Sequence, residues 1–203
     1  MLYTDIGNFR VYYQASDDHI QEICFDSDCG DNYTRGHTFP IPLKGSALAF
    51  ICTPSKTGGM PVLRGFYQHS DLRIMEVVWD GNWHAGAFIN GNCTVESQSH
   101  ISACISSLGQ ICVYWTNHCG TFHSVTECIC KDGNWLVPKL ISVCCSKEGP
   151  RLLCCAHVPE KPAQTRVRLF FVGCNGLICD ARRENEHWGW GGKQGGACQW
   201  EKC

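Results

Sequence analysis

Short runs rich in β-branched and aromatic residues alternate with polar turns along the whole chain. Residues 10–14 and 19–25 are two such runs, and Ala15-Ser16-Asp17-Asp18 is the polar turn between them. This pattern predicts two strands joined in a hairpin. A period of 3.6 residues, which would indicate a helix, is not sustained anywhere in the sequence. The chain is therefore predicted to be all-β.

The first hairpin is repeated along the chain. In three copies an Arg precedes a carboxylate by twelve residues, and these pairs are Arg10/Glu22, Arg64/Glu76 and Arg168/Asp180. A degraded copy has Cys112 at the place of the Arg and Glu127 as its carboxylate. The four carboxylates are 54, 51 and 53 residues apart. Self-similarity at such a period is typical of repeat architectures.

An aromatic residue follows each carboxylate, and these residues are Tyr33, Trp83, Trp135 and Trp188. Together the two series indicate four repeats, at approximately residues 1–42, 43–97, 98–138 and 139–194. The first repeat lacks a small apolar opening strand, and residues 195–203 resemble one, so we expect the C-terminus to close the first blade. A ring closed in this way has no exposed sheet edges. Residues 1–203 are thus predicted to form one β-propeller domain of four blades.

Composition and charge exclude several functions. The formal net charge is −2, so the chain lacks the excess of positive charge that would attract a nucleic acid. No run approaches eighteen apolar residues, so we expect no insertion into a membrane. Residues 1–5 lack the features of a secretory signal, which favours a cytoplasmic or non-classically secreted protein.

The chain has 17 cysteines, an odd number, and many of them lie in apolar runs. Free buried thiols are favoured, and several disulfides remain the alternative. His118, Cys119 and His123 are the best candidates for a metal site, but no second ligand pair matches them, so we expect neither metal nor cofactor.

The repeated order Arg-Val-Tyr-x-Gln, Ile-Gln-Glu-x-x-x-Asp and a later Trp resembles the fungal fucose-specific lectins of the Aleuria type. The resemblance is strongest over residues 9–26 and 63–84 and continues, more weakly, to residue 192. It implies a propeller with L-fucose pockets between adjacent blades, in which one blade supplies Arg and Glu and the next an aromatic residue. This chain departs from the family in its four repeats, where the family has six blades, and in its cysteine content.

The resemblance implies two well-matched pockets and two weaker ones. The matched pockets consist of Arg10, Glu22 and Trp83, with Trp79 in the apolar wall, and of Arg64, Glu76 and Trp135, with Cys130 at the wall position. The weaker pockets consist of Glu127 and Trp188, where Cys112 replaces the Arg, and of Arg168, Asp180 and Tyr33, where Asp and Tyr replace Glu and Trp.

Two other interpretations of these residues remain open. An Arg and a Glu facing each other across a hairpin can be a plain surface ion pair, and a periodic Trp can serve only to pack blades. The preferred function is a lectin for fucosylated glycans, for which a homo-oligomer is one option, and the alternative is a non-catalytic propeller scaffold for protein partners. Glycosidases use two carboxylates at one bond, whereas each pocket here has one carboxylate beside an Arg, so we expect no enzyme activity.

Overall fold

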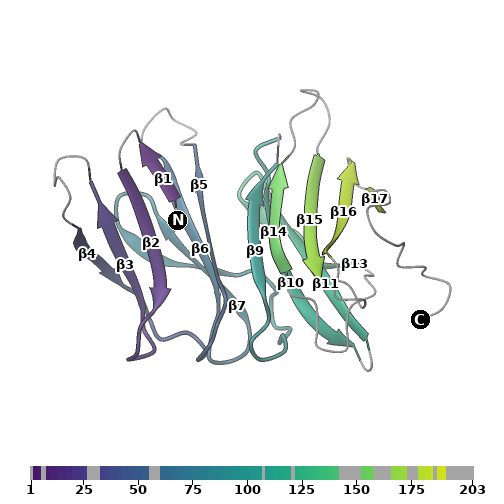
Figure 1. Ribbon diagram of the computed structural model, residues 1–203, viewed down its shortest axis with the longest axis horizontal. Helices are drawn as coiled ribbons and strands as arrows, with labels where there is room; N and C mark the ends of the chain where they lie inside the picture. The colour runs from purple at the N-terminus through teal and green to yellow at the C-terminus, as the bar shows by residue number, and fades with distance from the viewer. Residues whose placement is uncertain are drawn as a thin grey trace. The chain divides into compact units, whose positions relative to one another are not determined.

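The computed structural model contains strands and no helix among the residues that it describes, which are 2–5, 8–26, 33–54, 60–106, 108–119, 122–141, 152–157, 166–172, 178–184 and 187–190. The all-β prediction is therefore confirmed. The strands form four separate antiparallel sheets, and none of these sheets closes on itself (Figure 1). No helix in this part of the chain is long and apolar enough to cross a membrane.

The chain divides into two compact units, residues 1–98 and residues 99–203. The first unit holds two sheets of four strands. One sheet consists of β1 (Leu2–Asp5), β2 (Asn8–Gln14), β3 (Ile20–Phe25) and β4 (Thr34–Thr38). The other consists of β5 (Leu48–Thr53), β6 (Val62–Gln68), β7 (Ile74–Trp79) and β8 (Trp83–Phe88).

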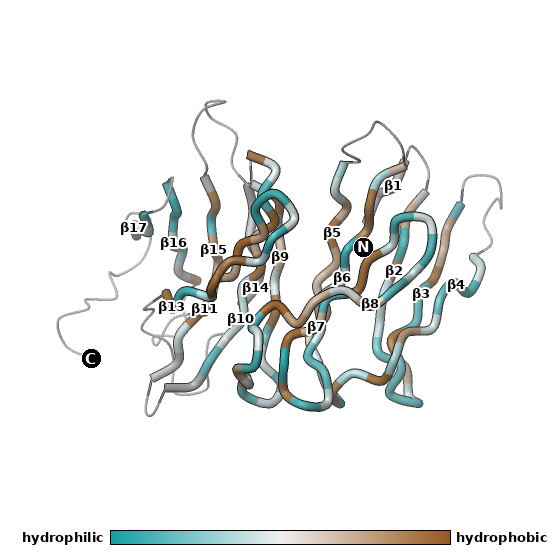
Figure 2. Tube along the Cα trace, turned by 180° about the vertical axis from the view of Figure 1, so that it is seen from behind, coloured by the Kyte–Doolittle hydropathy of each residue, from teal (hydrophilic) through white to brown (hydrophobic). Residues whose placement is uncertain are grey.

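The second unit also holds two sheets. The third sheet consists of β9 (Ile101–Ile105), β10 (Ile111–Cys119), β11 (Phe122–Lys131), β12 (Asn134–Trp135) and β13 (Lys139–Ile141). The fourth consists of β14 (Leu152–His157), β15 (Arg166–Val172), β16 (Ile178–Glu184) and β17 (His187–Trp190). Hydrophobic stretches lie within the strands, as along β9 and β11 (Figure 2).

Strands that follow each other in sequence pair with each other, because short polar turns reverse the chain between them. The β2–β3 and β6–β7 turns are built alike. In the first, the amide of Ala15 donates to the carbonyl of His19 over 2.8 Å, and in the second the amide of His69 donates to Arg73 over the same distance. The predicted hairpin is thus present, and its copy in the second sheet has the same turn geometry.

Strand β1 was not expected. It pairs with β2 at Leu2↔Arg10 and Tyr3↔Phe9, so the first sheet has an opening strand from the N-terminus. The prediction that the first repeat lacks this strand is wrong, because pattern analysis did not recognise the short segment before Asn8 as a strand. Residues 195–203, which we expected to close this sheet, lie outside the described residues.

The outer edge of the third sheet differs from the expected repeat boundary. β13 pairs with β11 through Val125↔Ile141 and Glu127↔Lys139, so Leu140 and Ile141 belong to the third sheet. The sequence placed them at the start of the fourth repeat. Pro138 separates β12 from β13, and proline cannot donate to a strand ladder, which explains why the outer edge is split into two short strands.

Each unit has a hydrophobic core to which both of its sheets contribute. In the first unit, Ile20 and Phe39 pack with Tyr67 and Val77 of the second sheet. In the second unit, the core is formed by Cys104, Cys112, Tyr114, Val125, Ile141, Val167, Leu169, Phe171 and Ala181. Its two cysteines, Cys104 and Cys112, are buried free thiols, as expected for cysteines in apolar strands.

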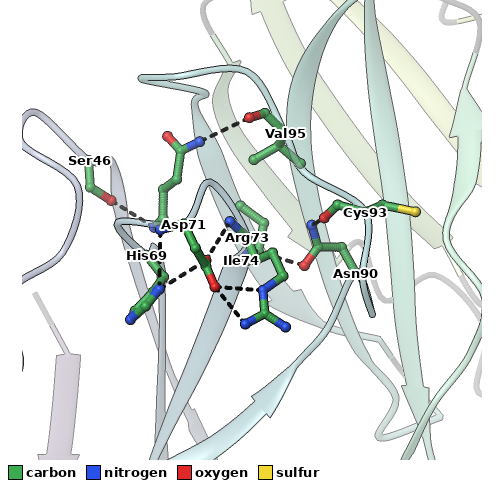
Figure 3. Close-up of polar contacts among 9 residues, drawn as sticks. Ser46, His69, Asp71, Arg73, Ile74, Asn90, Cys93 and Val95 are labelled. Carbon is green, nitrogen blue, oxygen red and sulfur yellow. Dashed lines mark hydrogen bonds and ion pairs between the residues drawn. The ribbon is translucent and has the colours of Figure 1, made fainter.

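Two buried amide side chains connect the loop after β8 to the second sheet (Figure 3). Gln68 of β6 donates to the carbonyl of Glu96 over 2.7 Å. Asn90 accepts a hydrogen bond from the amide of Ile74 over 3.0 Å and donates one to the carbonyl of Cys93. The Asn90 side chain is 3 % exposed, and it satisfies the buried amide of Ile74, which would otherwise have to find another partner away from solvent.

Asn90→Ala is expected to lower the free energy of unfolding by about 1–3 kcal/mol for each buried group that loses its partner. Urea unfolding followed by circular dichroism measures this change. Asn92→Ala is the matched control, because Asn92 is exposed in the same loop. Equal losses in the two variants would contradict the role assigned to Asn90.

Candidate functional site

In every sheet a carboxylate on the third strand lies opposite an aromatic residue on the second strand. The cross-strand pairs are Tyr12↔Glu22, Phe66↔Glu76, Tyr114↔Glu127 and Phe170↔Asp180. The Arg expected to face the carboxylate stands two residues before the aromatic residue. It is therefore on the same face as the carboxylate, as predicted, but as its diagonal neighbour.

The first site is built around Glu22, a buried carboxylate on β3. The Tyr12 hydroxyl donates to its Oε1 over 2.8 Å, and the amide of His37 donates to its Oε2 over 3.0 Å. Arg10 Nε lies 4.0 Å from Oε1, while Arg10 Nη1 contacts Asp26 at 2.7 Å. Arg10 thus lies between two carboxylates, and Asp26, Tyr12 and His37 are site residues that the sequence did not identify.

A bulge on β4 places the His37 amide at Glu22. Ile23 pairs with Arg35 and Gln21 with Thr38, so two residues of β4 stand opposite Glu22. A Cβ on Gly36 would lie against Glu22 Oε2 far inside the van der Waals limit. Only glycine leaves room for the carboxylate here.

The second sheet repeats this bulge at Glu76. Met75 pairs with Phe88 and Val77 with Ala85, and a Cβ on Gly86 would lie 2.7 Å from Glu76 Oε2. Both bulges have a glycine, Gly36 and Gly86, in the strand that follows the carboxylate strand. This recurrence is the sequence signal that could have identified the bulges.

Trp83 of β8 reaches the first site from the second sheet. Its ring lies edge-on to Tyr12 at 6.1 Å between centroids and to Phe39 at 4.7 Å. It is also roughly parallel to His37, at 6.1 Å and 27°. Trp83 therefore lies beside Tyr12 and His37, the residues that hold Glu22, and its part in a sugar pocket stays a prediction.

Trp79, expected in the apolar wall of the first pocket, lies at the end of β7 directly opposite Trp83. Within the described residues, no hydrogen bond, ion pair or ring contact joins Trp79 to Arg10 or Glu22. Its role in a wall stays a prediction.

The second site contains the closest Arg–Glu pair of the first unit. Arg64 Nη1 lies 2.5 Å from Glu76 Oε1, and the Ala87 amide donates to Oε2 over 3.3 Å. Arg64 Nε is buried and has no hydrogen-bond partner. Trp135, expected to complete this site, lies in the second unit at the end of β12, and its part in the site stays a prediction.

The third site has an arginine that the sequence did not predict. Cys112 does replace the Arg of its own sheet, but Arg183 of β16 lies 2.5 Å from Glu127 Oε1. The Tyr114 hydroxyl donates to the same oxygen over 2.9 Å, and Trp188 Nε1 donates to Oε2 over 3.4 Å. Glu127 and Trp188 therefore meet, and the guanidinium beside Glu127 comes from β16 rather than from β10.

The fourth site differs most from the expectation. Asp180 pairs with Arg182 at 3.1 Å, and Arg168 stands opposite Arg182 in the strand ladder. Within the described residues no hydrogen bond or ion pair joins Arg168 to Asp180. Tyr33 belongs to the first unit, where its ring lies 5.8 Å from that of Phe25. The grouping of Arg168, Asp180 and Tyr33 stays a prediction.

The tyrosines at the first and third sites are held in their neutral, donating form. Burial raises the pKa of Tyr12, and the negative charge of Glu22 raises it further. Burial likewise raises the pKa of Tyr114. For Arg10, burial alone would lower the pKa, but the hydrogen bond to Asp26 and the charges nearby raise it overall. The first site thus combines a neutral donor, a guanidinium and carboxylate acceptors.

No group of three His, Cys, Asp or Glu side chains in the described part of the chain is placed to hold a metal ion. For His118, Cys119 and His123, the structure describes backbone positions at the β10–β11 hairpin.

The chain thus has four antiparallel sheets, and each carries a carboxylate opposite an aromatic residue and close to an arginine. The family model of the fungal fucose-specific lectins matches residues 1–198. The chain belongs to this family.

Individual relatives agree with that assignment. A fucose-specific lectin of Arthrobotrys oligospora, g276, is 34 % identical over 83 residues, which cover 36 % of this chain and 21 % of the relative. The crystal structure of AofleA from the same organism has a TM-score of 0.71 at 22 % identity, over 90 % of this chain and 53 % of that one. The six-bladed β-propeller of the Aleuria aurantia lectin has a TM-score of 0.73 at 21 % identity, over 93 % and 59 %. This chain thus shares their fold and spans less than two thirds of their length.

Gly36→Ala is expected to push the Glu22 carboxylate out of its place and to break its bond with the His37 amide. The steric conflict and the lost hydrogen bond should together lower the free energy of unfolding by about 1–3 kcal/mol. Chemical unfolding measures the change. Gly189→Ala is the matched control, because a Cβ there would meet only the Arg182 carbonyl oxygen, at 3.9 Å. A tolerated Gly36→Ala would contradict the steric account.

Tyr12 is expected to make unfolding depend on pH in alkaline solution. An unfolded tyrosine ionises near pH 10, whereas the raised pKa keeps Tyr12 protonated in the folded state. Its contribution to stability is therefore fully present below about pH 10 and is lost as the pH rises further. Tyr12→Phe should flatten the fall of the unfolding free energy above that pH. Tyr13→Phe, an exposed tyrosine on the same strand, is the control, and an equal effect there would refute the assignment.

Proposed function

We propose that this chain is a non-catalytic lectin that recognises L-fucose or fucosylated glycans between adjacent sheets. The observation that carries the proposal is the first site, where Arg10 lies near Glu22 on one sheet and Trp83 of the next sheet packs against Tyr12, the residue that binds Glu22. Family membership supports it, and so does the Aleuria aurantia lectin, which was crystallised in complex with α-methyl-L-fucoside.

The chemistry of the first site suits a pyranose. Sugar hydroxyls both donate and accept hydrogen bonds, and a guanidinium supplies donors while a carboxylate supplies acceptors. Hydrogen bonds to charged groups are roughly twice as strong as neutral ones, which helps a hydrophilic ligand to compete with water. Trp83 offers a large apolar surface to the C–H face of a sugar ring.

The second site offers the same combination of groups. Arg64 Nη1 is bound to Glu76, and the Arg64 side chain is 24 % exposed, so part of its guanidinium is accessible to a ligand. We therefore assign Arg64 and Glu76 to a second pocket.

The carboxylates at these sites suit binding better than catalysis. At the first, second and third sites the carboxylate lies beside an arginine, which suits an acceptor of sugar hydroxyls. A glycosidase needs two carboxylates flanking one glycosidic bond, one of them as general acid. Binding therefore fits these groups better than hydrolysis.

We further propose that the four sheets are four blades of a β-propeller and that several pockets act together. Single sugar pockets of this kind bind weakly, because a small ligand makes few contacts. Engagement of a glycan-covered surface at several pockets multiplies the affinity without any new contact in each pocket. Such a ring could be completed by the chain itself or by a second copy.

Titration calorimetry with α-methyl-L-fucoside tests the function directly. The unmodified chain is expected to bind about two sugars, and Glu22→Gln should remove one of these sites. The amide keeps the size of the side chain but replaces charge-assisted bonds, so affinity at that pocket should fall by roughly one to two orders of magnitude.

Asp17→Asn is the control, because it makes the same chemical change at an exposed position of the β2–β3 turn. A folded protein that gives no heat at millimolar fucoside would overturn the proposal and leave the protein-binding propeller scaffold as the better function.

A further inference from the structure

The third carboxylate site obtains its arginine from a different strand than the first two sites. Arg10 and Arg64 lie on the strand that pairs with their own carboxylate strand, whereas Arg183 comes from β16 of the next sheet. Cys112 occupies the place of the missing arginine, and Arg183 Nη2 lies 3.3 Å from its Sγ. The guanidinium of Arg183 thus reaches between Cys112 and Glu127.

Arg183 stands at the position that corresponds to Trp79, the residue predicted for the apolar wall of the first site. It follows Asp180 by three residues and pairs with Trp188, just as Trp79 follows Glu76 by three and pairs with Trp83. A tryptophan at this position has no charge and only one N–H donor for a carboxylate. An arginine there can extend into the space beside Glu127, and the small side chain of Cys112 leaves that space open.

Burial separates this arginine from those of the proposed sugar pockets. The Arg183 side chain is 2 % exposed, whereas those of Arg10 and Arg64 are 19 % and 24 % exposed. A sugar hydroxyl must reach the guanidinium to accept its hydrogen bond, and at Arg183 no such access exists.

Both oxygens of the Glu127 carboxylate already accept hydrogen bonds from the protein. Glu127 Oε1 receives hydrogen bonds from Tyr114 and Arg183, and Oε2 receives one from Trp188. The tryptophan that would stack on a sugar thus donates to the carboxylate instead. Cys112 and Tyr114 are completely buried in the hydrophobic core of the second unit.

We propose that Arg183 closes the third pocket by occupying the place that a sugar would take, so that this site joins the third and fourth sheets and binds no sugar. The statement about sugar rests on the proposed lectin function, whereas the joining of the two sheets does not. Arg183 is then the residue that decides how many sugars the chain binds.

A swap of two side chains tests this assignment. Cys112→Arg with Arg183→Trp returns the guanidinium to the strand that holds it in the first site and restores an aromatic wall. The swapped chain is expected to bind one more α-methyl-L-fucoside than the unmodified chain in titration calorimetry. Adding Glu127→Gln to the swap should remove that extra site. A folded swap variant without an extra site would overturn the proposal.

A second variant keeps the test decisive if the swap does not fold. Glu127→Gln with Arg183→Met replaces the buried ion pair by neutral side chains of similar size, a change that buried pairs often tolerate. The number of fucosides bound should stay the same. Loss of one site in this variant would mean that Glu127 binds sugar in the unmodified protein, and the proposal would fail.

Unfolding experiments without sugar test whether Arg183 and Glu127 join the third and fourth sheets. Either single change, Glu127→Gln or Arg183→Met, leaves a buried charge without its partner, so each should lower the urea midpoint more than the double change does. If the losses of the two single variants add up in the double variant, Glu127 and Arg183 do not interact directly. If the unmodified chain binds no fucoside but the swap binds one, the proposed function fails while the closure of the third pocket stands.

Discussion

A negative charge buried between strands is the constraint on which the sites of this protein depend. Glu22, Glu76 and Glu127 each lie on the third strand of a sheet and are each almost fully buried. A buried carboxylate is costly unless hydrogen bonds and a cation compensate it. A tyrosine supplies part of that compensation at Glu22 and Glu127, a bulged amide at Glu22 and Glu76, and an arginine at all three.

The compensation need not be the same at each carboxylate. At Glu22 the nearest guanidinium is shared with Asp26, and at Glu76 an arginine of the same sheet makes a close ion pair. At Glu127 the arginine comes from the neighbouring sheet and is itself buried. The more completely the protein satisfies its own carboxylate, the less of that group remains for a ligand. Repeats with almost the same sequence can therefore differ in function.

The tryptophans combine packing with site formation. Trp83 meets Tyr12 edge-on at 6.1 Å, and Trp188 meets Tyr114 edge-on at 6.0 Å, so both units place an aromatic ring against the tyrosine that binds the carboxylate. Both tryptophans also pack against their hydrophobic cores. The two interpretations of the periodic aromatics, as blade packing and as part of a site, are thus compatible.

The sequence by itself determined the all-β class, the hairpins and the residue types of the sites. These features depend on local patterns: alternation within a strand, polar turns, and a carboxylate at a constant distance from an arginine. The family resemblance added the prediction that Trp83 of the second sheet belongs to the same pocket as Glu22 of the first sheet. The same patterns did not identify β1, whose place as a strand depends on its partner β2.

Only the tertiary structure decided which arginine serves which carboxylate. Arg183 and Glu127 are 56 residues apart and meet because the third and fourth sheets pack together around the core of the second unit. The sequence repeat pointed to position 112 instead, where Cys112 stands fifteen residues before Glu127, since the repeat describes partners within one hairpin. A contact between sheets depends on how two side chains of different length fill a shared space, and no period in the sequence records that.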